Sequence, residues 1–520
     1  MISDAAPEET ARAGADPAGL EPAKPELPAA HRQSSRSLLI RNVSLLTGSQ
    51  LLIWCVTLAW TLIVPRRLGA GQMGVYTLAQ AATGILLVVV GLGLRPFLVR
   101  EIAADRSRAP VLIGTAIVLG GILLVPALGG ALIVIRAGGM SGDPALAVLL
   151  GWSICVFVVV SDPILAAFQA IQKMQYLAYS QFLNNGVVGL ATICLALLGV
   201  RAIGILTAGV AMVCVETVLY LVWARSHFAI RWRVTPRAVL GLLRESLPYS
   251  TMAIAFTFYL WIDSLMLGIM TSTKVLGWYG LPTRIFGVLM MAPVILSNAW
   301  LPQLVQAYNS GPDALRARAR PAMELVLVLS MPACVGTVLV AGPLIQTLYG
   351  GGFSGSVTVL VLLAFCLPPM YLNVMANQVM IASGRQIVWT RVMVVACVVN
   401  PIANLFLIPY FQRTGGNGAI GASIAMVVTE VVLSGIAMVL IRRIFAGASL
   451  LRALKGMVAT AGMAVAVLLA LRLGLVAGIA AGLVSFPLLA LLLRVLSREE
   501  RELLRSGVRK VTRRLRPRFA

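Results

Sequence analysis

From Asn400 to Glu430 the chain reads NPIANLFLIPYFQRTGGNGAIGASIAMVVTE. Two apolar segments, each part of a run long enough to cross the hydrocarbon core of a bilayer as a helix, flank a Gly-rich turn. Polar side chains lie inside these segments, namely Asn400, Asn404 and Glu430, and Pro401 follows the first of them. Because polar groups at that depth are costly, they mark function or helix–helix contact. The stretch predicts two membrane helices that carry such groups.

Apolar runs of this kind recur along the whole chain. The 520 residues are 59% hydrophobic, and their mean hydropathy is +0.91. About fourteen runs of membrane-spanning length lie between residues 44 and 496. We therefore expect an all-α polytopic membrane protein with about 14 transmembrane helices. The last two runs are the weakest part of this count, since they could form one re-entrant hairpin.

The basic residues predict an orientation. The formal net charge is +23, and most of the 42 Lys and Arg lie at the two ends and in the even-numbered loops between the predicted spans. That bias is the positive-inside pattern, so both termini should be cytoplasmic, and the charge requires no nucleic acid as a partner. Residues 1–36 have no secretory apolar region and predict a disordered tail. The basic end of the chain should contact anionic membrane lipids.

The sequence contains an internal repeat. The pattern AMVxxE occurs at Ala211–Glu216 and again at Ala425–Glu430, while Gly74–Tyr76 matches Gly277–Tyr279. Each half then holds six helices in the same orientation, which predicts two lobes related by a pseudo-twofold axis along the membrane normal. The expected organisation is a cytoplasmic tail at 1–36, an N-lobe at 37–240, a C-lobe at 241–445, two further helices at 446–496 and a basic cytoplasmic tail at 497–520.

Four ionisable residues inside the predicted spans are candidates for coupling, gating or binding. Asp263 and Arg284 lie in neighbouring spans, where an unpaired charge costs about 2.5–3.5 kcal/mol. They either face a cavity that gates, binds an ion or holds a headgroup, or they form a structural salt bridge. Glu216 and Glu430 occupy matching repeat positions and either bond to a neighbouring helix or couple transport to protons.

Further candidates could line a cationic cavity together with Arg284. Arg66 and Arg67 lie on the outer side, against the positive-inside tendency, and Arg95 precedes Pro96 in the second span. A guanidinium group suits phosphate because its planar fork matches two oxygens at once. The alternative role for arginines at span ends is to anchor the helix at the interface. Asn400 and Asn404 would add amides to the same substrate-binding set.

Several function classes are disfavoured. The sequence contains no P-loop pattern, so nothing indicates that the chain drives transport with its own ATPase. The odd-numbered loops are short and offer no catalytic side chains of the kind a polysaccharide polymerase or ligase would carry. The seven Cys all fall inside predicted spans without metal-ligand spacing. We therefore expect no enzyme activity, no metal and no cofactor.

Motifs along the chain resemble a known family. They are Asn42–Gly48, Leu68–Tyr76, Asp263–Gly268, Tyr349–Phe353 and the stretch from Asn400 to Glu430. Their order resembles the polysaccharide-transport branch, the O-antigen and oligosaccharide repeat-unit flippases, of the multidrug/oligosaccharidyl-lipid/polysaccharide (MOP) exporter superfamily. The resemblance covers roughly residues 38–496.

What the resemblance implies is a two-lobe carrier in the bacterial inner membrane, used in lipopolysaccharide or exopolysaccharide synthesis. It would move an undecaprenyl-pyrophosphate-linked oligosaccharide from the cytoplasmic to the periplasmic leaflet by alternating access. Polysaccharide polymerase and assembly proteins would be further partners. A multidrug or small-molecule antiporter and a lipid II flippase of the same superfamily are the alternatives.

Overall fold

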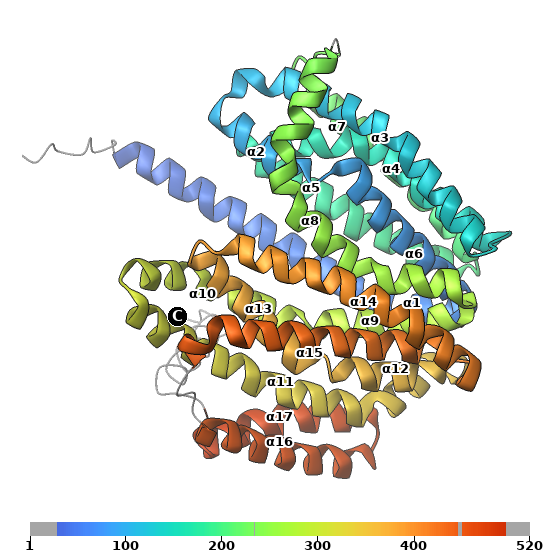
Figure 1. The fold of residues 1–520 in the computed structure, drawn as a ribbon, viewed down its shortest axis with the longest axis vertical. Coiled ribbons are helices and arrows are strands. Elements are labelled where there is room, and N and C mark those ends of the chain that lie inside the picture. Colours follow the sequence, from blue (N-terminus) through green and yellow to red (C-terminus); the bar gives the residue numbers. More distant parts are fainter. Residues whose placement is uncertain (1–28, 233, 446–449, 496–520) are drawn as a thin grey trace, which may run out of the picture. The chain divides into compact units, whose positions relative to one another are not determined.

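The structure is a computed structural model that describes residues 29–232, 234–445 and 450–495 (Figure 1). Within these ranges the secondary structure is helical and contains no strand. A helix satisfies every backbone hydrogen bond inside one segment, which hydrocarbon demands. The all-α class is confirmed. The predicted tail at 497–520 and most of the one at 1–36 lie outside the described residues, while residues 29–36 belong to the first helix.

Helix α1 (Ala29–Gly91) holds the first two predicted spans. At Gly69 φ is 73° and ψ is 169°, a conformation that glycine adopts without strain, and two helices meet there. In the described residues, twelve segments are long and apolar enough to cross a membrane, and the bent pair α12–α13 makes thirteen. Cys55–Gly91 counts once among them although it is broken at Gly69, and there the sequence predicts two spans, so the described residues give one span fewer than the fourteen predicted.

The helices that follow α1 pack around α4. Helix α4 contacts α2, α3, α5 and α7, and α7 also contacts α6. The fifth predicted span is one continuous segment that changes its winding, because α5 passes into a π-helical turn, η2, and then into α6. These elements are α2 (Leu94–Ala104), η1 (Arg106–Arg108), α3 (Ala109–Ala137), α4 (Asp143–Ala170), α5 (Met174–Gln181), η2 (Phe182–Val187), α6 (Val188–Leu197) and α7 (Ala202–Arg225).

Helix α8 (Pro236–Met270) links the two halves of the chain, because it contacts α2 and α3 as well as α9, α14 and α15. The later helices pack on α11 and α15. Helices α12 and α13 meet at a 44° bend just before two consecutive prolines. The elements are α9 (Thr273–Leu289), α10 (Met291–Asn309), α11 (Pro312–Tyr349), η3 (Gly351–Phe353), α12 (Gly355–Ala364), α13 (Leu367–Ala382), α14 (Gln386–Gly415) and α15 (Gly418–Phe445).

The last two helices, α16 (Leu450–Leu471) and α17 (Leu475–Leu492), lie side by side and pack on α11 (Figure 1). Each is long and apolar enough to span a membrane by itself. The pair therefore has the length of two full spans, and the alternative of one re-entrant hairpin is not favoured.

Candidate functional site

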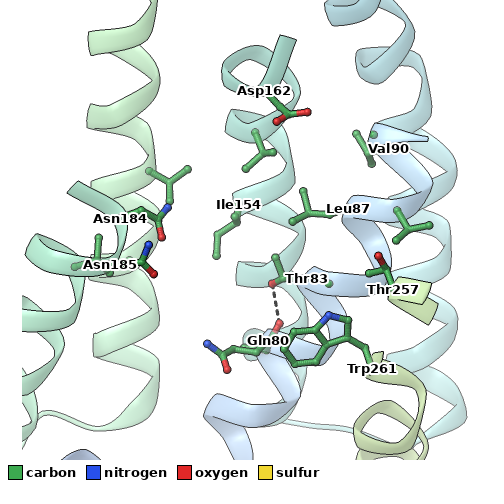
Figure 2. Close-up of a pocket in the computed structure, with 18 of the residues that line it drawn as sticks. Gln80, Thr83, Leu87, Val90, Ile154, Asp162, Asn184, Asn185, Thr257 and Trp261 are labelled. Carbon is green, nitrogen blue, oxygen red and sulfur yellow. Dashed lines mark hydrogen bonds between the residues drawn. The ribbon is translucent and has the colours of Figure 1, made fainter. Parts of the chain in front are cut away.

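A cavity with a volume of about 770 Å³ lies among the described residues. Its walls come from α1, α2, α3, α4, η2, α6 and α7 of the first half and from α8 and α9 of the second half. Figure 2 shows Asp162 toward one end of this cavity and Gln80 and Trp261 toward the other. Polar side chains line a space that lies inside membrane-spanning segments, and such a space suits a polar cargo.

Arg284 of α9 is the cationic group at the Gln80 end. Its guanidinium carbon lies 4.0 Å from the ring centroid of Trp60 and 5.5 Å from that of Tyr76. The same group donates a hydrogen bond to Oε1 of Gln80. A guanidinium over aromatic faces gains about 2 kcal/mol when it is desolvated. In the described residues no carboxylate forms an ion pair with Arg284, so the cavity keeps an uncompensated positive charge there.

Arg95 of α2 lies at the opposite end and is neutralised. Its guanidinium donates to Asp162 of α4 at 3.1 Å and to Gln169 at 3.3 Å. The side chains of Arg95 and Asp162 remain 40% and 35% exposed. Asp162 directly precedes Pro163 in α4, and its pairing with Arg95 could not be read from the sequence. A charge pair that faces solvent in the cavity can still turn toward a bound ligand.

Asn184 and Asn185 line the cavity and were also missed from the sequence (Figure 2). Both belong to the π-helical turn η2. Two consecutive amides inside an apolar span were the available signal, because exposed amides at membrane depth require water or a ligand. π-Helical turns are frequent at functional sites.

The salt bridge considered for Asp263 and Arg284 is absent from the described residues, and each side chain has other partners. Asp263 is only 6% exposed. It accepts hydrogen bonds from the hydroxyl of Tyr279 at 3.0 Å and from the amide of Asn404 at 2.6 Å. Asn404 also donates to Asn400 at 2.9 Å. These groups form one buried network between α8, α9 and α14, and none of them lines the large cavity.

The two repeat-related glutamates are both buried but have different surroundings. Glu430 accepts hydrogen bonds from the hydroxyl of Tyr259 and from the amide of Asn373, the latter at 2.7 Å. Glu216 receives only a long contact of 3.5 Å from the amide of Asn184, and its Oε1 atom has no partner among the described residues. Glu430 therefore ties α8 and α13 to α15, whereas Glu216 lies close to the cavity wall.

Arg66 and Arg67 do not line the large cavity. They line a second, smaller hollow of about 590 Å³ with four aliphatic side chains. Of the four arginines proposed for a cationic cavity, the structure brings Arg95 and Arg284 into one space and leaves Arg66 and Arg67 outside it.

Comparisons with known proteins place this geometry in a family. The model of the polysaccharide biosynthesis protein family matches residues 39–307, just over half of the chain. The probable flippase AglR of Haloferax volcanii is 29% identical over 171 residues, which are 32% of this chain and 34% of that protein. The matched segment thus spans about a third of the length of this curated relative.

Solved structures show the same fold. The lipid II flippase MurJ in an inward closed conformation superimposes with a TM-score of 0.67 at 12% identity, covering 88% of this chain and 99% of that one. An inward-facing multidrug resistance MATE transporter of the MOP superfamily gives a TM-score of 0.58 at 15% identity, covering 76% and 96%. The extent of the family match shows that the chain belongs to the polysaccharide biosynthesis protein family, on the fold of the MOP superfamily transporters.

Proposed function

We propose that the protein is a flippase that moves an undecaprenyl-pyrophosphate-linked oligosaccharide from the cytoplasmic to the periplasmic leaflet of the bacterial inner membrane. The observation that carries the proposal is Arg284, a cation without a carboxylate partner among the described residues, in a cavity of about 770 Å³ at membrane depth. The name of the relative AglR, a probable flippase, and the family match support it.

The chemistry of this cargo matches the cavity. A pyrophosphate-linked sugar has an anionic, strongly hydrated head that does not cross hydrocarbon unaided. The guanidinium fork of Arg284 can hold two phosphate oxygens, and the bonds are stronger because both partners are charged. Stacking on Trp60 holds the fork in place, so less conformational entropy is lost when the phosphate binds. Arg95, already paired with Asp162, supplies weaker attraction at the other end.

Alternating access is supported by the helices that line the cavity, because they come from both proposed lobes. Most of the cavity belongs to the proposed N-lobe at residues 37–240, while α8 and α9 of the proposed C-lobe at 241–445 supply Trp261 and Arg284. A cavity built from two lobes opens to either leaflet when the lobes rock against each other. The positive-inside pattern supports cytoplasmic termini.

The membrane potential supplies a driving force for this direction. Moving one negative charge outward across an inside-negative membrane gains about 2.3 kcal/mol per 100 mV, and a doubly charged pyrophosphate gains roughly twice that. Asp263, Glu216 and Glu430 are the candidates for an additional coupled cation. Asp263 is the foremost of them, because its buried network offers several oxygen atoms in one place.

The test is transport by the purified protein in sealed vesicles that contain undecaprenyl-pyrophosphate-linked oligosaccharide. An impermeant glycosidase added outside reports how fast inner-leaflet lipid becomes accessible. We expect the wild type to expose the inner pool and an inside-negative potential to alter the rate. Arg284→Ala should slow exposure at least tenfold. Absence of wild-type transport would contradict the proposal.

The same vesicles separate the rival functions. A lipid II flippase would move lipid II in preference to the oligosaccharide lipid. A multidrug antiporter would move a cationic dye in exchange for protons or sodium, and an unpaired arginine in the cavity disfavours such cargo. Copurification with a polysaccharide polymerase would identify an assembly partner and would favour the oligosaccharide cargo.

A further inference from the structure

The membrane-spanning segment Met174–Leu197 presents two neighbouring amides to the cavity. Residues Phe182–Val187 form a π-helical turn, closed by a hydrogen bond from the amide of Val188 to the carbonyl of Leu183. Neighbouring residues of other helices, such as Ile205 and Leu206 of α7, also line this cavity, so this turn is distinguished by its two amides and not by their spacing. Here both Asn184 and Asn185 line the one cavity, and Figure 2 shows them next to each other on its wall.

Most of the hydrogen-bonding capacity of these amides is unused. The nitrogen of Asn185 donates to the carbonyl of Gln181 at 3.3 Å, and that of Asn184 makes only the long contact with Glu216. Among the described residues no donor reaches either amide oxygen. Both side chains are exposed within a membrane-spanning segment. Each amide can donate two hydrogen bonds and accept two, so the pair can bind a polar, uncharged ligand.

The neighbouring walls supply the complementary surface. Trp261 of α8 faces the same cavity, and its indole packs on α1 where a Cβ atom at Gly84 would lie 2.5 Å from the ring. Thr83 and Gln80 add a hydroxyl and an amide (Figure 2). Sugar rings present hydroxyl groups, which both donate and accept, and apolar C–H faces, which pack on flat aromatic rings. Amides that share a cavity with a partly buried indole fit that chemistry, whereas a phosphate requires the cation at Arg284.

We propose that Asn184 and Asn185 form a saccharide subsite that recognises the hydroxyl and acetamido groups of the sugar next to the pyrophosphate. The subsite rests on the proposed flippase function and assigns the two parts of the cargo to different helices. Arg284 on α9 binds the phosphates and sets affinity. The π-helical turn binds the sugar and sets selectivity between a lipid that carries a glycan and one that does not.

Binding in nanodiscs tests this assignment with two probes, undecaprenyl pyrophosphate and undecaprenyl-pyrophosphate-linked N-acetylglucosamine. The wild type should bind the sugar-bearing probe about tenfold more tightly, as expected from two or three neutral hydrogen bonds. The double variant Asn184→Leu/Asn185→Leu has side chains of nearly equal size that form no hydrogen bonds. It should bind both probes equally, with an unchanged Kd for the sugarless lipid.

Phe182→Leu is the matched control, because Phe182 belongs to the same turn, is 40% exposed and does not line the cavity. It should keep the tenfold preference. The subsite is overturned if the wild type shows no preference, if the double variant keeps it, or if the double variant loses affinity for both probes alike. If the wild type binds neither of the two probes, the flippase function on which the subsite rests is overturned instead.

Discussion

Gly74 of α1 and Gly277 of α9 lie backbone against backbone where the two halves of the chain meet. A Cβ atom at Gly74 would lie 1.7 Å from the carbonyl oxygen of Thr273, and one at Gly277 would lie 1.9 Å from that of Ala70. The two glycines occupy matching positions in the sequence repeat. A contact between equivalent glycines agrees with the predicted pseudo-twofold relation of the two halves, and only residues without a side chain allow helices to approach so closely.

This crossing predicts that Gly277→Ala impairs the protein. The added methyl group must push α9 away from α1, and overpacking of this kind costs about 1–3 kcal/mol. We expect a lower melting temperature in detergent and slower flipping in vesicles, since the cavity next to the crossing changes shape. Gly287→Ala on the same helix has nothing within 4 Å of its new methyl group and should behave as wild type. Equal behaviour of the two variants would refute the close contact.

The stacking of Arg284 on Trp60 predicts a role for an aromatic residue that cannot itself bind phosphate. Trp60→Leu removes the ring below the guanidinium and should weaken binding of undecaprenyl pyrophosphate about tenfold. Combined with Arg284→Ala it should add no further loss, because both changes act on one interaction. Trp232→Leu, at a residue 59% exposed and outside the cavity, is the control. Additive losses in the double variant would argue against the pairing.

The unequal surroundings of the repeat-related glutamates predict unequal effects on stability. Glu430→Gln replaces one of the two accepting oxygens with an NH₂ donor that faces Tyr259 or Asn373. One buried group then loses its hydrogen-bond partner, which lowers the free energy of unfolding by about 1–3 kcal/mol. Glu216→Gln disturbs only one long contact and should cost clearly less. Thermal unfolding of the two variants in the same detergent checks the order, and a larger loss for Glu216→Gln would reverse our interpretation.

The buried network around Asp263 predicts an effect on coupling. If Asp263 holds the coupled cation, Asp263→Asn should make flipping independent of proton and sodium gradients and leave the response to membrane potential. Transport rates measured with each gradient imposed separately in vesicles decide this. Asn298→Asp places a carboxylate in another membrane segment, beside Gln378, and should leave the gradient dependence of the wild type unchanged. If flipping by Asp263→Asn still depends on the ion gradients, the network around Asp263 serves helix packing and not ion coupling.

Length, hydropathy and charge determined the class of the protein. The helical spans could be predicted because they depend on local composition and on the thickness of a bilayer, while the orientation inferred from the charge bias stays a prediction. The positions of costly polar groups were also evident, since Asp263, Arg284, Asn404 and Glu430 stand out against apolar neighbours. The repeat in the sequence indicated that Gly74 and Gly277 are equivalent, but not that they touch.

Only the tertiary structure decided which partner each polar group has. Arg284 bonds to Gln80, 204 residues away in sequence, and Asp263 bonds to Asn404 across 141 residues, so the mutual salt bridge that was one of the two alternatives does not form. The same packing puts Arg66 and Arg67 outside the cavity and brings Asn184 into it. Composition requires a buried polar group to have some partner, but helix packing determines which groups come within about 3 Å of each other.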